Sequence, residues 1–582
     1  MVCEADGLPW LRMSKNISSL SGRDGKELDD SLWERLQQEA DGRGTPATEQ
    51  LTAVARDFLV GEAVAYGTSS FYDFLCRENA GKKAYVCNGS TCLVAGTQHH
   101  VHNELRKHFK EDEIGHMCCL GRCHENSAFN VGGINYSGGS IDKLEELVKE
   151  ASLPPAQRKV DTGGRHHVGT SMEQPILTAP MPPLDAFYAL WERVLLSNSA
   201  DVLNEIKVAT IRGRGGAGFP MGFKLETCRN AEDTTGNGTP RKYIVCNADE
   251  GDPAAFSDRY LLEQRPHRVL LGMMIAGYCV GADTGVLYIR AEYPEAIAIV
   301  KQAVADLQAN GWIGTDIKGS GFNFRFKVIK AAGAYVCGEE TALLNSIEGK
   351  RGEVRTRPPY PAQQGLFNRP TVVNNVETLA CVPWVVEHGG AAFAELGSEK
   401  SNDTKLVSLD SAFNRPGLYE VECGTPLRTV LYELGLGFNK KVKALHIGGP
   451  LGGIVPMSKI DALSIDFESF QKEGFLLGHA SVLSIPQDFP LIEYLEHLFQ
   501  FTSVESCGKC FPCRIGSKRG EEMIARARSG EAKMDRALFN DLLETMEIGS
   551  LCALGGGLPL GVKNALQYFG EELKGYFDGT AQ

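Results

Sequence analysis

The sequence lacks the features that mark several large classes of protein. Its basic residues are scattered and its formal net charge is -13, which argues against nucleic acid as a partner because phosphate neutralisation needs clustered lysine and arginine. The most apolar window, 269–282, is too short to cross a bilayer, and the N-terminus has no charged start followed by an apolar stretch. We therefore expect a soluble, cytoplasmic protein without a transmembrane segment.

The sequence also lacks the cysteine pattern of a secreted, disulfide-bonded protein. Seventeen cysteines is an odd number for a long chain, and a reducing cytosol disfavours a disulfide framework. Isolated cysteines such as Cys228, Cys246 and Cys381 are expected to be buried thiols. Two groups of cysteines are not isolated, and these are candidates for metal ligation.

The order of local patterns predicts a multidomain α/β protein. A chain of 582 residues with 43% hydrophobic content can bury several cores. Helical spacing dominates both ends, and strand-like runs alternate with helical runs in the middle, which indicates a sheet with crossover connections. The expected parts are N-terminal helices in 1–80, a small α/β layer in 81–152, a linker in 153–182, a large α/β domain in 183–400, a small α+β domain in 401–488 and helices in 489–582.

The segment SCGKCFPCR supplies Cys507, Cys510 and Cys513, and Cys552 stands alone further on. Three cysteines separated by two residues each can converge on one side of a cubane, while the fourth comes from a distant helix, so the pattern predicts a 4Fe-4S cluster. Zinc is the main alternative, although zinc sites usually provide a second close pair.

A second group consists of Cys87 and Cys92 in CNGSTC and Cys119 and Cys123 in CLGRC. Four thiolates on two loops suit a 2Fe-2S cluster. Cys118 adjoins Cys119 and could replace it as a ligand. A redox-active dithiol is the weaker alternative, because no CxxC motif precedes a helix here.

The segment IRGRGGAGFP places Gly213, Gly215 and Gly218 at GxGxxG spacing. Glycines allow the backbone to approach a phosphate closely, and the N-terminus of a following helix would favour the anion. The preceding residues, DVLNEIKVAT, have a helical pattern, so the usual strand-first dinucleotide motif is not met. A simple turn remains an alternative for this loop.

Polar and acidic residues follow three strand-like runs, in CNADEGDP, GAYVCGEE and NNVET. Ligands of open α/β sheets bind at such strand ends. Carboxylates accept hydrogen bonds from ribose hydroxyls and repel a 2′-phosphate, which favours NAD over NADP. A solvated acidic face would explain one such run but not three beside glycines.

Together these motifs resemble the NADH-binding flavoprotein subunit of respiratory complex I and its relatives in soluble NAD-dependent formate dehydrogenases and bidirectional hydrogenases. The likeness covers about 185–577, and the preceding part resembles a fused copy of the thioredoxin-like subunit that holds a 2Fe-2S cluster. It implies a thioredoxin-like 2Fe-2S domain, a Rossmann-like FMN and NADH domain, a ubiquitin-like domain and a helical bundle with a 4Fe-4S cluster.

The resemblance also implies which residues bind the cofactors. FMN is expected on Gly213, Arg214, Gly215, Gly218, Lys224, Asn247, Asp249, Tyr335, Gly338, Asn374 and Asn375. NADH is expected against Phe219, Glu250, Asp252, Glu339, Glu340 and Tyr360. The chain departs from the family pattern at Leu225, Asp252, Arg357 and Tyr360, where Trp, Glu, Lys and Phe are usual. Apart from Leu225, these changes keep charge or ring character.

By the same resemblance, hydride passes between the nicotinamide and the flavin, positioned by Glu250 and Glu340, with no side chain acting as a covalent catalyst. Single electrons then pass to the 4Fe-4S cluster, and the 2Fe-2S cluster is expected to serve as a side store. The exact sequences of the motifs favour the diaphorase subunit of a formate dehydrogenase, whose partner would be a catalytic subunit with molybdenum or tungsten. A NAD-reducing hydrogenase with its own catalytic subunits is the alternative; a subunit of complex I and a non-catalytic scaffold rank lower.

Overall fold

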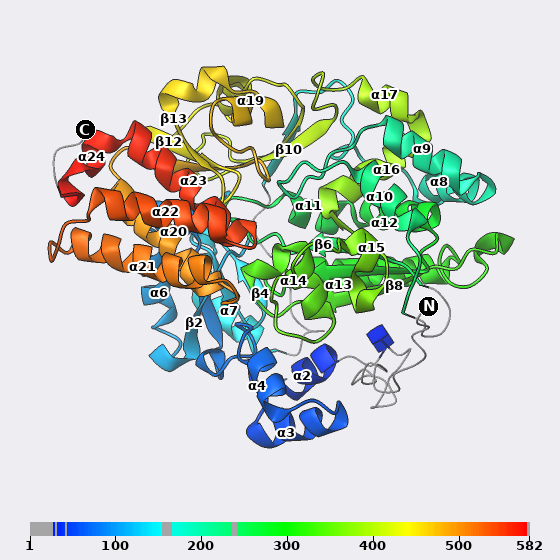
Figure 1. The fold of residues 1–582 in the computed structure, drawn as a ribbon, viewed down its shortest axis with the longest axis horizontal. Coiled ribbons are helices and arrows are strands. Elements are labelled where there is room, and N and C mark those ends of the chain that lie inside the picture. Colours follow the sequence, from blue (N-terminus) through cyan, green and yellow to red (C-terminus); the bar gives the residue numbers. More distant parts are fainter. Residues whose placement is uncertain (1–26, 30–31, 41–43, 154–165, 236–240, 579–582) are drawn as a thin grey trace, which may run out of the picture.

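The computed structural model describes residues 27–29, 32–40, 44–153, 166–235 and 241–578. Figure 1 shows a large central domain (green), a small α+β domain above it (yellow) and a helical bundle at one end (orange to red). The N-terminal helices and the N-terminal α/β domain (blue) lie below. The multidomain α/β architecture expected from the sequence is confirmed.

The N-terminal α/β domain contains a sheet in the order β2-β1-β3-β4. Its strands are β1 (Ala84–Cys87), β2 (Ile114–Met117), β3 (Phe129–Val131) and β4 (Ile134–Tyr136), and its helices are α5 (Ser90–Val94), α6 (Gln98–Leu105) and α7 (Leu144–Ala151). Strands β1 and β2 are parallel, while β3 and β4 form an antiparallel hairpin. Val86, Val101, Leu105 and Phe129 fill the core between them.

The central domain contains a parallel sheet in the order β8-β7-β6-β9. Its strands are β6 (Tyr243–Ala248), β7 (Thr284–Ile289), β8 (Arg325–Lys330) and β9 (Thr371–Asn375). The chain runs outward from β6 to β8 and then returns to the other side of β6. The strand order therefore reverses between β6 and β9, which is where ligands bind in Rossmann-like sheets.

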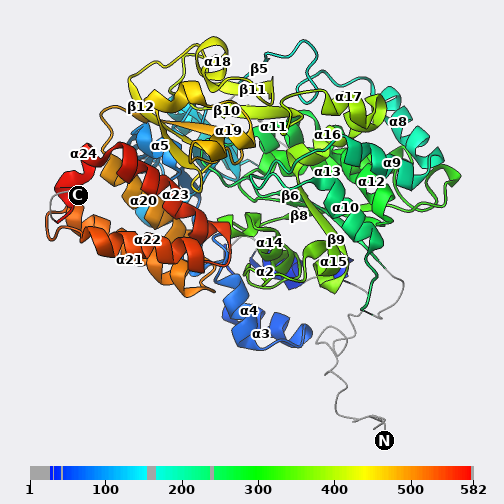
Figure 2. The same ribbon diagram turned by 45° about the horizontal axis from the view of Figure 1, so that its top comes forward.

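Helices cover both faces of the central sheet. One face packs against α12 (Pro266–Val280) and α16 (Val376–His388). The other face packs against α14 (Glu340–Ile347) and α2 (Leu32–Ala40), and the apolar cluster continues into α3 (Thr48–Asp57) and α4 (Glu62–Ser69). Trp33 is buried in this layer and donates a hydrogen bond to the carbonyl oxygen of Lys330 at 3.2 Å. Figure 2 shows α2 behind α14.

The small α+β domain has a six-stranded sheet in the order β13-β12-β14-β10-β11-β5. Five strands belong to this domain in sequence: β10 (Thr404–Leu409), β11 (Gly417–Glu422), β12 (Val442–Ile447), β13 (Gly453–Pro456) and β14 (Ser481–Pro486). The sixth, β5 (His167–Thr170), comes from the segment 153–182 that the sequence predicts to be a linker, and it pairs in parallel with β11.

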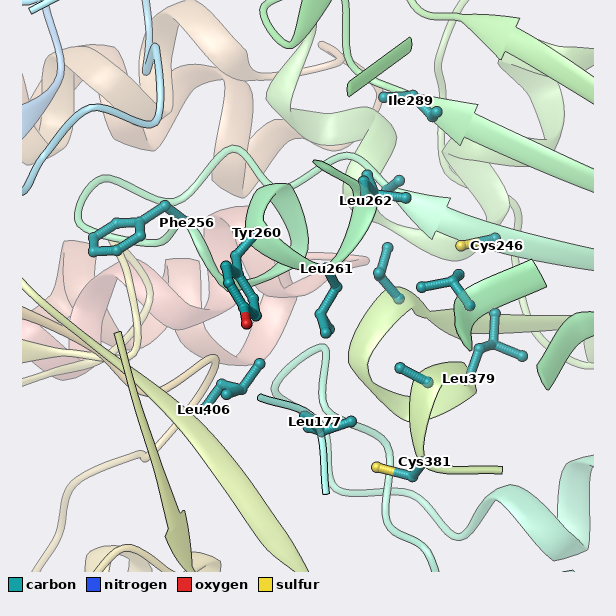
Figure 3. Packing of buried hydrophobic residues seen from close by; sticks show 14 of the residues in the cluster. Leu177, Cys246, Phe256, Tyr260, Leu261, Leu262, Ile289, Leu379, Cys381 and Leu406 are labelled. Atoms are coloured by element: carbon teal, nitrogen blue, oxygen red, sulfur yellow. The ribbon is translucent and has the colours of Figure 1, made fainter. Parts of the chain in front are cut away.

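The rest of the described part of this segment is also packed. The buried carboxylate of Glu420 accepts hydrogen bonds from the backbone N–H groups of Ile176, Leu177 and Thr178 at 2.9, 2.9 and 2.8 Å. Figure 3 shows Leu177 pointing into the apolar cluster between Leu406 and Cys381. Residues 166–182 therefore join domains rather than merely spacing them, while 154–165 lie outside the described residues.

The helical bundle consists of α20 (Leu491–Glu505), α21 (Phe511–Arg528), α22 (Arg536–Gly549) and α23 (Ala553–Tyr568). Glycines let these helices approach closely: a Cβ on Gly520 would lie 2.1 Å from the Phe499 ring. The bundle holds the last four cysteines at the ends of its helices, next to the central domain.

Candidate functional site

A cavity of about 760 Å³ opens where β6 and β9 end. Its wall contains every residue expected to bind FMN or NADH except Arg214 and Gly218: Gly213, Gly215, Phe219, Lys224, Asn247, Asp249, Glu250, Asp252, Tyr335, Gly338, Glu339, Glu340, Tyr360, Asn374 and Asn375. These residues come from five separate stretches of sequence. The strand reversal in the sheet brings the stretches together.

The glycine loop lies between two helices, α9 (Ser199–Val208) and α10 (Met221–Asn230). The prediction that a helix rather than a strand precedes it is therefore confirmed. The N–H of Gly213 donates to the carbonyl of Phe219 at 2.8 Å and closes the loop. Gly216 has a φ of 106°, a conformation that favours glycine. Gly213 and Gly215 consequently present bare backbone to the cavity.

The structure does not bring Arg214 and Gly218 to the cavity wall. Arg214 is buried, its guanidinium forms an ion pair with Asp403 of the small α+β domain, and its backbone N–H donates to Thr378 at 2.9 Å. The Gly218 carbonyl accepts a hydrogen bond from Arg212 at 2.9 Å. Arg214 turns away from the cavity because a buried guanidinium needs a carboxylate partner, and Asp403 supplies it. Gly218 shapes the loop through its hydrogen bond with Arg212.

Buried polar groups at the ends of β6 and β9 face the cavity. Burial raises the pKa of Asp249 to about 8. Among the described residues, Asp249 Oδ2 and Asn374 Nδ2 are buried without a hydrogen-bond partner. Asn247 donates to the Gly338 carbonyl at 2.7 Å, which fixes the loop after β8. Two unpaired buried polar atoms on one wall fit a planar heterocycle that carries hydrogen-bond donors and acceptors, as a flavin does.

The acidic residues around the cavity have different tasks. Asp252 accepts a hydrogen bond from the Tyr335 hydroxyl at 2.5 Å, and burial raises the pKa of its carboxyl. The Glu250 carboxylate accepts the N–H groups of Asp258 and Arg259 at 3.0 and 3.1 Å. The sequence motif places these two carboxylates close together, but their roles differ. Glu250 caps the N-terminus of a helix, whereas Asp252 accepts a hydrogen bond that positions Tyr335.

The mouth of the cavity carries aromatic rings and mixed charge. Phe219 and Tyr360 are 44% and 55% exposed, which leaves their faces available for stacking. Lys224 lies 3.4 Å from Glu340, which also pairs with Arg357 at 2.9 Å. The sequence did not single out Phe223, which packs edge-on against Phe219 with ring centroids 5.7 Å apart. Its position four residues after Phe219 is the signal that could have revealed it.

The four C-terminal cysteines gather at helix ends. Cys510 is the residue before α21 and Cys552 the residue before α23. Ser506 Oγ lies 3.3 Å from Cys513 Sγ, and the first turn of α23 packs on Cys513 at Gly555. Helix N-termini favour negatively charged sulfur ligands. Cys552 also lines the cavity, so the two sites share a wall.

Cys87, Cys92, Cys119 and Cys123 lie together in the N-terminal α/β domain, and each is buried. Cys123 Sγ accepts a hydrogen bond from the N–H of Ala254, in the central domain, at 3.2 Å. Cys118 is only half-buried, and its carbonyl accepts a hydrogen bond from Arg290 at 2.7 Å.

Family models match three parts of the chain. The Nuo51 FMN-binding domain matches residues 206–384, the NADH-ubiquinone oxidoreductase-F iron-sulfur binding region matches 493–576, and the thioredoxin-like [2Fe-2S] ferredoxin matches 26–152. The NADP-reducing hydrogenase subunit HndC of Solidesulfovibrio fructosivorans is 41% identical over 66% of this chain and 78% of its own length. The chain belongs to the complex I family of flavoprotein electron-transfer subunits.

Other members of this family match over most of their length. The mitochondrial 51 kDa subunit of the NADH-ubiquinone oxidoreductase of Neurospora crassa is 34% identical over 67% of this chain and 80% of its own length. The alpha subunit of the NAD-reducing hydrogenase HoxS of Cupriavidus necator is 32% identical over 87% of this chain and 85% of its own. A crystal structure of a NAD+-reducing [NiFe]-hydrogenase in the air-oxidized state superposes with a TM-score of 0.80 at 27% identity, covering 95% of this chain and 94% of that one.

As a member of this family the protein is an NADH dehydrogenase-type oxidoreductase subunit with FMN, NAD(H), a 2Fe-2S cluster and a 4Fe-4S cluster as cofactors. The expected cofactors are thereby confirmed. No helix in the described ranges is long and apolar enough to span a membrane.

Proposed function

We propose that the cavity holds FMN against the glycine loop and the ends of β6 and β9, with NAD(H) above it at the mouth. The single observation that carries this assignment is the shared wall: one cavity is bordered by the strand reversal, by Gly213 and Gly215, and by the cluster cysteine Cys552. Bound FMN accepts a two-electron hydride and releases single electrons, which a cluster next to it can take.

The chain's own residues bind and orient the reactants. Asp249 and Asn374 offer their unpaired buried atoms to the flavin ring, and Lys224 lies where it can neutralise phosphate charge. Phe219 and Tyr360 would stack on the dinucleotide, while Glu340, held by Lys224 and Arg357, would accept hydrogen bonds from its ribose. Because no side chain needs to react, the task of these groups is alignment and exclusion of water.

The isolated chain tests this assignment. Reconstituted protein should retain FMN and reduce an artificial dye with NADH. Tyr360→Ala should raise the KM for NADH about tenfold, the effect of losing about 1.4 kcal/mol of stacking, without loss of FMN. Tyr432→Ala is the matched control, since Tyr432 is exposed but belongs to the small α+β domain. Protein that keeps its clusters but neither FMN nor dye reduction would support a non-catalytic scaffold instead.

We propose further that the 4Fe-4S cluster passes electrons across an apolar collar to a partner subunit. The collar consists of Val504, Phe511, Ile515, Ile548 and Leu551, which are 44–78% exposed and stand beside the cluster cysteines. Exposed apolar side chains concentrated around a redox centre mark a surface that another protein covers. The partner must therefore carry its own electron acceptor close to its surface.

The first candidate for that partner is the catalytic subunit of a cytoplasmic, NAD-dependent formate dehydrogenase. The reason is that the segments GGPLGG and SCGKCFPCRIGSKRG resemble those of formate dehydrogenase diaphorase subunits. A hydrogenase is the second candidate, supported by the likeness to the alpha subunit of HoxS over 87% of this chain. Metal analysis of the co-purified assembly separates them: molybdenum or tungsten supports the first, and nickel supports the second.

A further inference from the structure

His479 reaches the cavity wall from the small α+β domain. It lies in the turn before β14, and the preceding Gly478 has a φ of 55°, where a Cβ would lie 2.6 Å from the Gly448 carbonyl. The imidazole is only 7% exposed and borders the cavity. The turn thus places a titratable ring from one domain into the binding site of another.

Two carboxylates of the central domain face this imidazole. His479 Nδ1 lies 3.8 Å from Glu250 Oε1, and Nε2 lies 3.5 Å from Asp258 Oδ2. Asp258 and Glu250 are themselves 1% and 5% exposed. Charged groups this deeply buried are stable only when opposite charges are paired.

The three groups could hold either a metal ion or a proton. The Glu250 carboxylate already accepts two backbone N–H groups and the Tyr293 hydroxyl, and Asp258 accepts the Asn375 side-chain N–H at 2.6 Å. Glu250 therefore keeps few lone pairs for a metal, whereas Asp258 Oδ1 has no hydrogen-bond partner. A proton on the imidazole requires no further ligand, because it makes Nε2 a donor toward Asp258 and Nδ1 a donor toward Glu250 and the Ser257 hydroxyl, 3.5 Å away.

We propose that His479 is a fixed, protonated positioning residue that offsets the charge of Glu250 and Asp258 beside the flavin site. The inference rests on the proposed placement of FMN in this cavity. Without the imidazolium, two uncompensated carboxylates would face a phosphorylated ligand that gains further negative charge when it is reduced. With it, the wall is less negative and both the binding and the reduction of that ligand are favoured.

The surrounding charges support protonation at neutral pH. Burial alone would lower the pKa of His479, but Asp258 and Glu250 outweigh it and raise the pKa to about 9, although Lys405 opposes them. Asp252 also faces the imidazole, and burial together with Glu250 raises the pKa of Asp258 to about 6. Lys405 is itself paired with the buried Glu377. At pH 7 to 8 the imidazole is therefore charged and the Asp258 carboxylate is ionised.

The first experiment replaces the charge but keeps a hydrogen-bonding side chain. His479→Gln should raise the dissociation constant of FMN about tenfold in a fluorescence titration at pH 7.5. It should also lower the midpoint potential of the bound flavin, by about 30 mV for each tenfold loss of preference for the reduced form. His446→Gln is the matched control, because His446 is a buried histidine of the same domain that bonds Tyr494 and the Gly452 carbonyl away from the cavity.

Charge replacement distinguishes an electrostatic role from packing. His479→Lys should recover most of the potential, and so should the double variant His479→Gln with Asp258→Asn, which removes one carboxylate along with the cation. A packing role would leave the double variant at least as impaired as the single one. That result would overturn the proposal.

The pH dependence of FMN binding provides a further test. The FMN dissociation constant of the wild-type protein should rise as the pH passes from 7 to 9.5, because the imidazole loses its proton near pH 9, and the rise should be smaller in His479→Gln, which keeps Asp249 but lacks the imidazole. A constant affinity over this range, or a divalent metal bound stoichiometrically beyond the cluster iron, would contradict the proposal. Wild-type protein that binds no FMN would instead overturn the proposed function itself.

Discussion

The two cysteine sets use the same ligand in opposite surroundings. Cys87, Cys92, Cys119 and Cys123 are at most 3% exposed and lie against the central domain. In the other set, Cys510 and Cys552 are partly exposed, Cys552 touches the flavin cavity, and the apolar collar stands around them. From these positions we expect the first, inner set to exchange electrons within the chain and the second, outer set to connect the cavity with a partner.

We expect the largest effect on electron transfer to the partner from removing a ligand of the outer set. Cys507→Ser should abolish the four-iron EPR signal and slow NADH-driven reduction of the partner at least about 100-fold. Dye reduction directly from the flavin should persist. Cys76→Ser is the control, because Cys76 belongs to neither set. Unchanged reduction of the partner without the cluster would show that electrons leave by another route.

A charge on the collar should weaken docking while the cluster stays intact. Phe511→Asp should raise the dissociation constant for the partner about 30-fold, the effect of losing about 2 kcal/mol at an interface centre. Surface plasmon resonance with the partner measures this, and EPR checks the cluster. Leu196→Asp alters a 90% exposed leucine of the central domain and should bind normally. Equal weakening of partner binding by both variants would show that the collar is not part of the interface.

Removing a ligand of the inner set should have a smaller effect on turnover. Cys119→Ser should eliminate the two-iron signal but lower NADH-driven dye reduction by less than about tenfold, a barrier change below about 1.4 kcal/mol. The reason is that a side store is not on the route from cavity to dye. Complete loss of flavin-dependent activity in folded protein would place the inner cluster on that route.

The smallest expected effect concerns one hydrogen bond to sulfur. Ser506→Ala removes the hydroxyl 3.3 Å from Cys513 Sγ and should lower the midpoint potential of the outer cluster by tens of millivolts, because hydrogen bonds to sulfur favour the reduced form. Redox titration followed by EPR measures the shift. Ser517→Ala is the control, since its hydroxyl bonds the Cys513 carbonyl and not the sulfur. A shift common to both variants would indicate altered packing.

Local patterns predicted much of this architecture. Apolar runs that end in Asn247 and Asn375 identify β6 and β9, because buried parallel strands are apolar and their ends are polar. The cysteine spacing likewise predicted both clusters, and the family match over 493–576 supports iron-sulfur over zinc for the C-terminal set.

What the sequence could not predict depends on contacts between domains. The side chain of Arg214 turns to Asp403 in another domain, and β5 joins a sheet whose other strands begin at Thr404. His479 belongs to the small α+β domain but borders the central cavity. No local periodicity records such pairings, since burial and charge compensation are decided only when the domains meet.

The strand β5 limits how the protein can be divided. A version that began at residue 183 would lose more than the inner cluster, because β11 would become an open sheet edge and Glu420 would keep a buried carboxylate without its three amide donors. Open edges recruit other strands and promote aggregation. A truncation that removes the two-iron domain should therefore keep residues 166–182, because they pack as part of the small α+β and central domains.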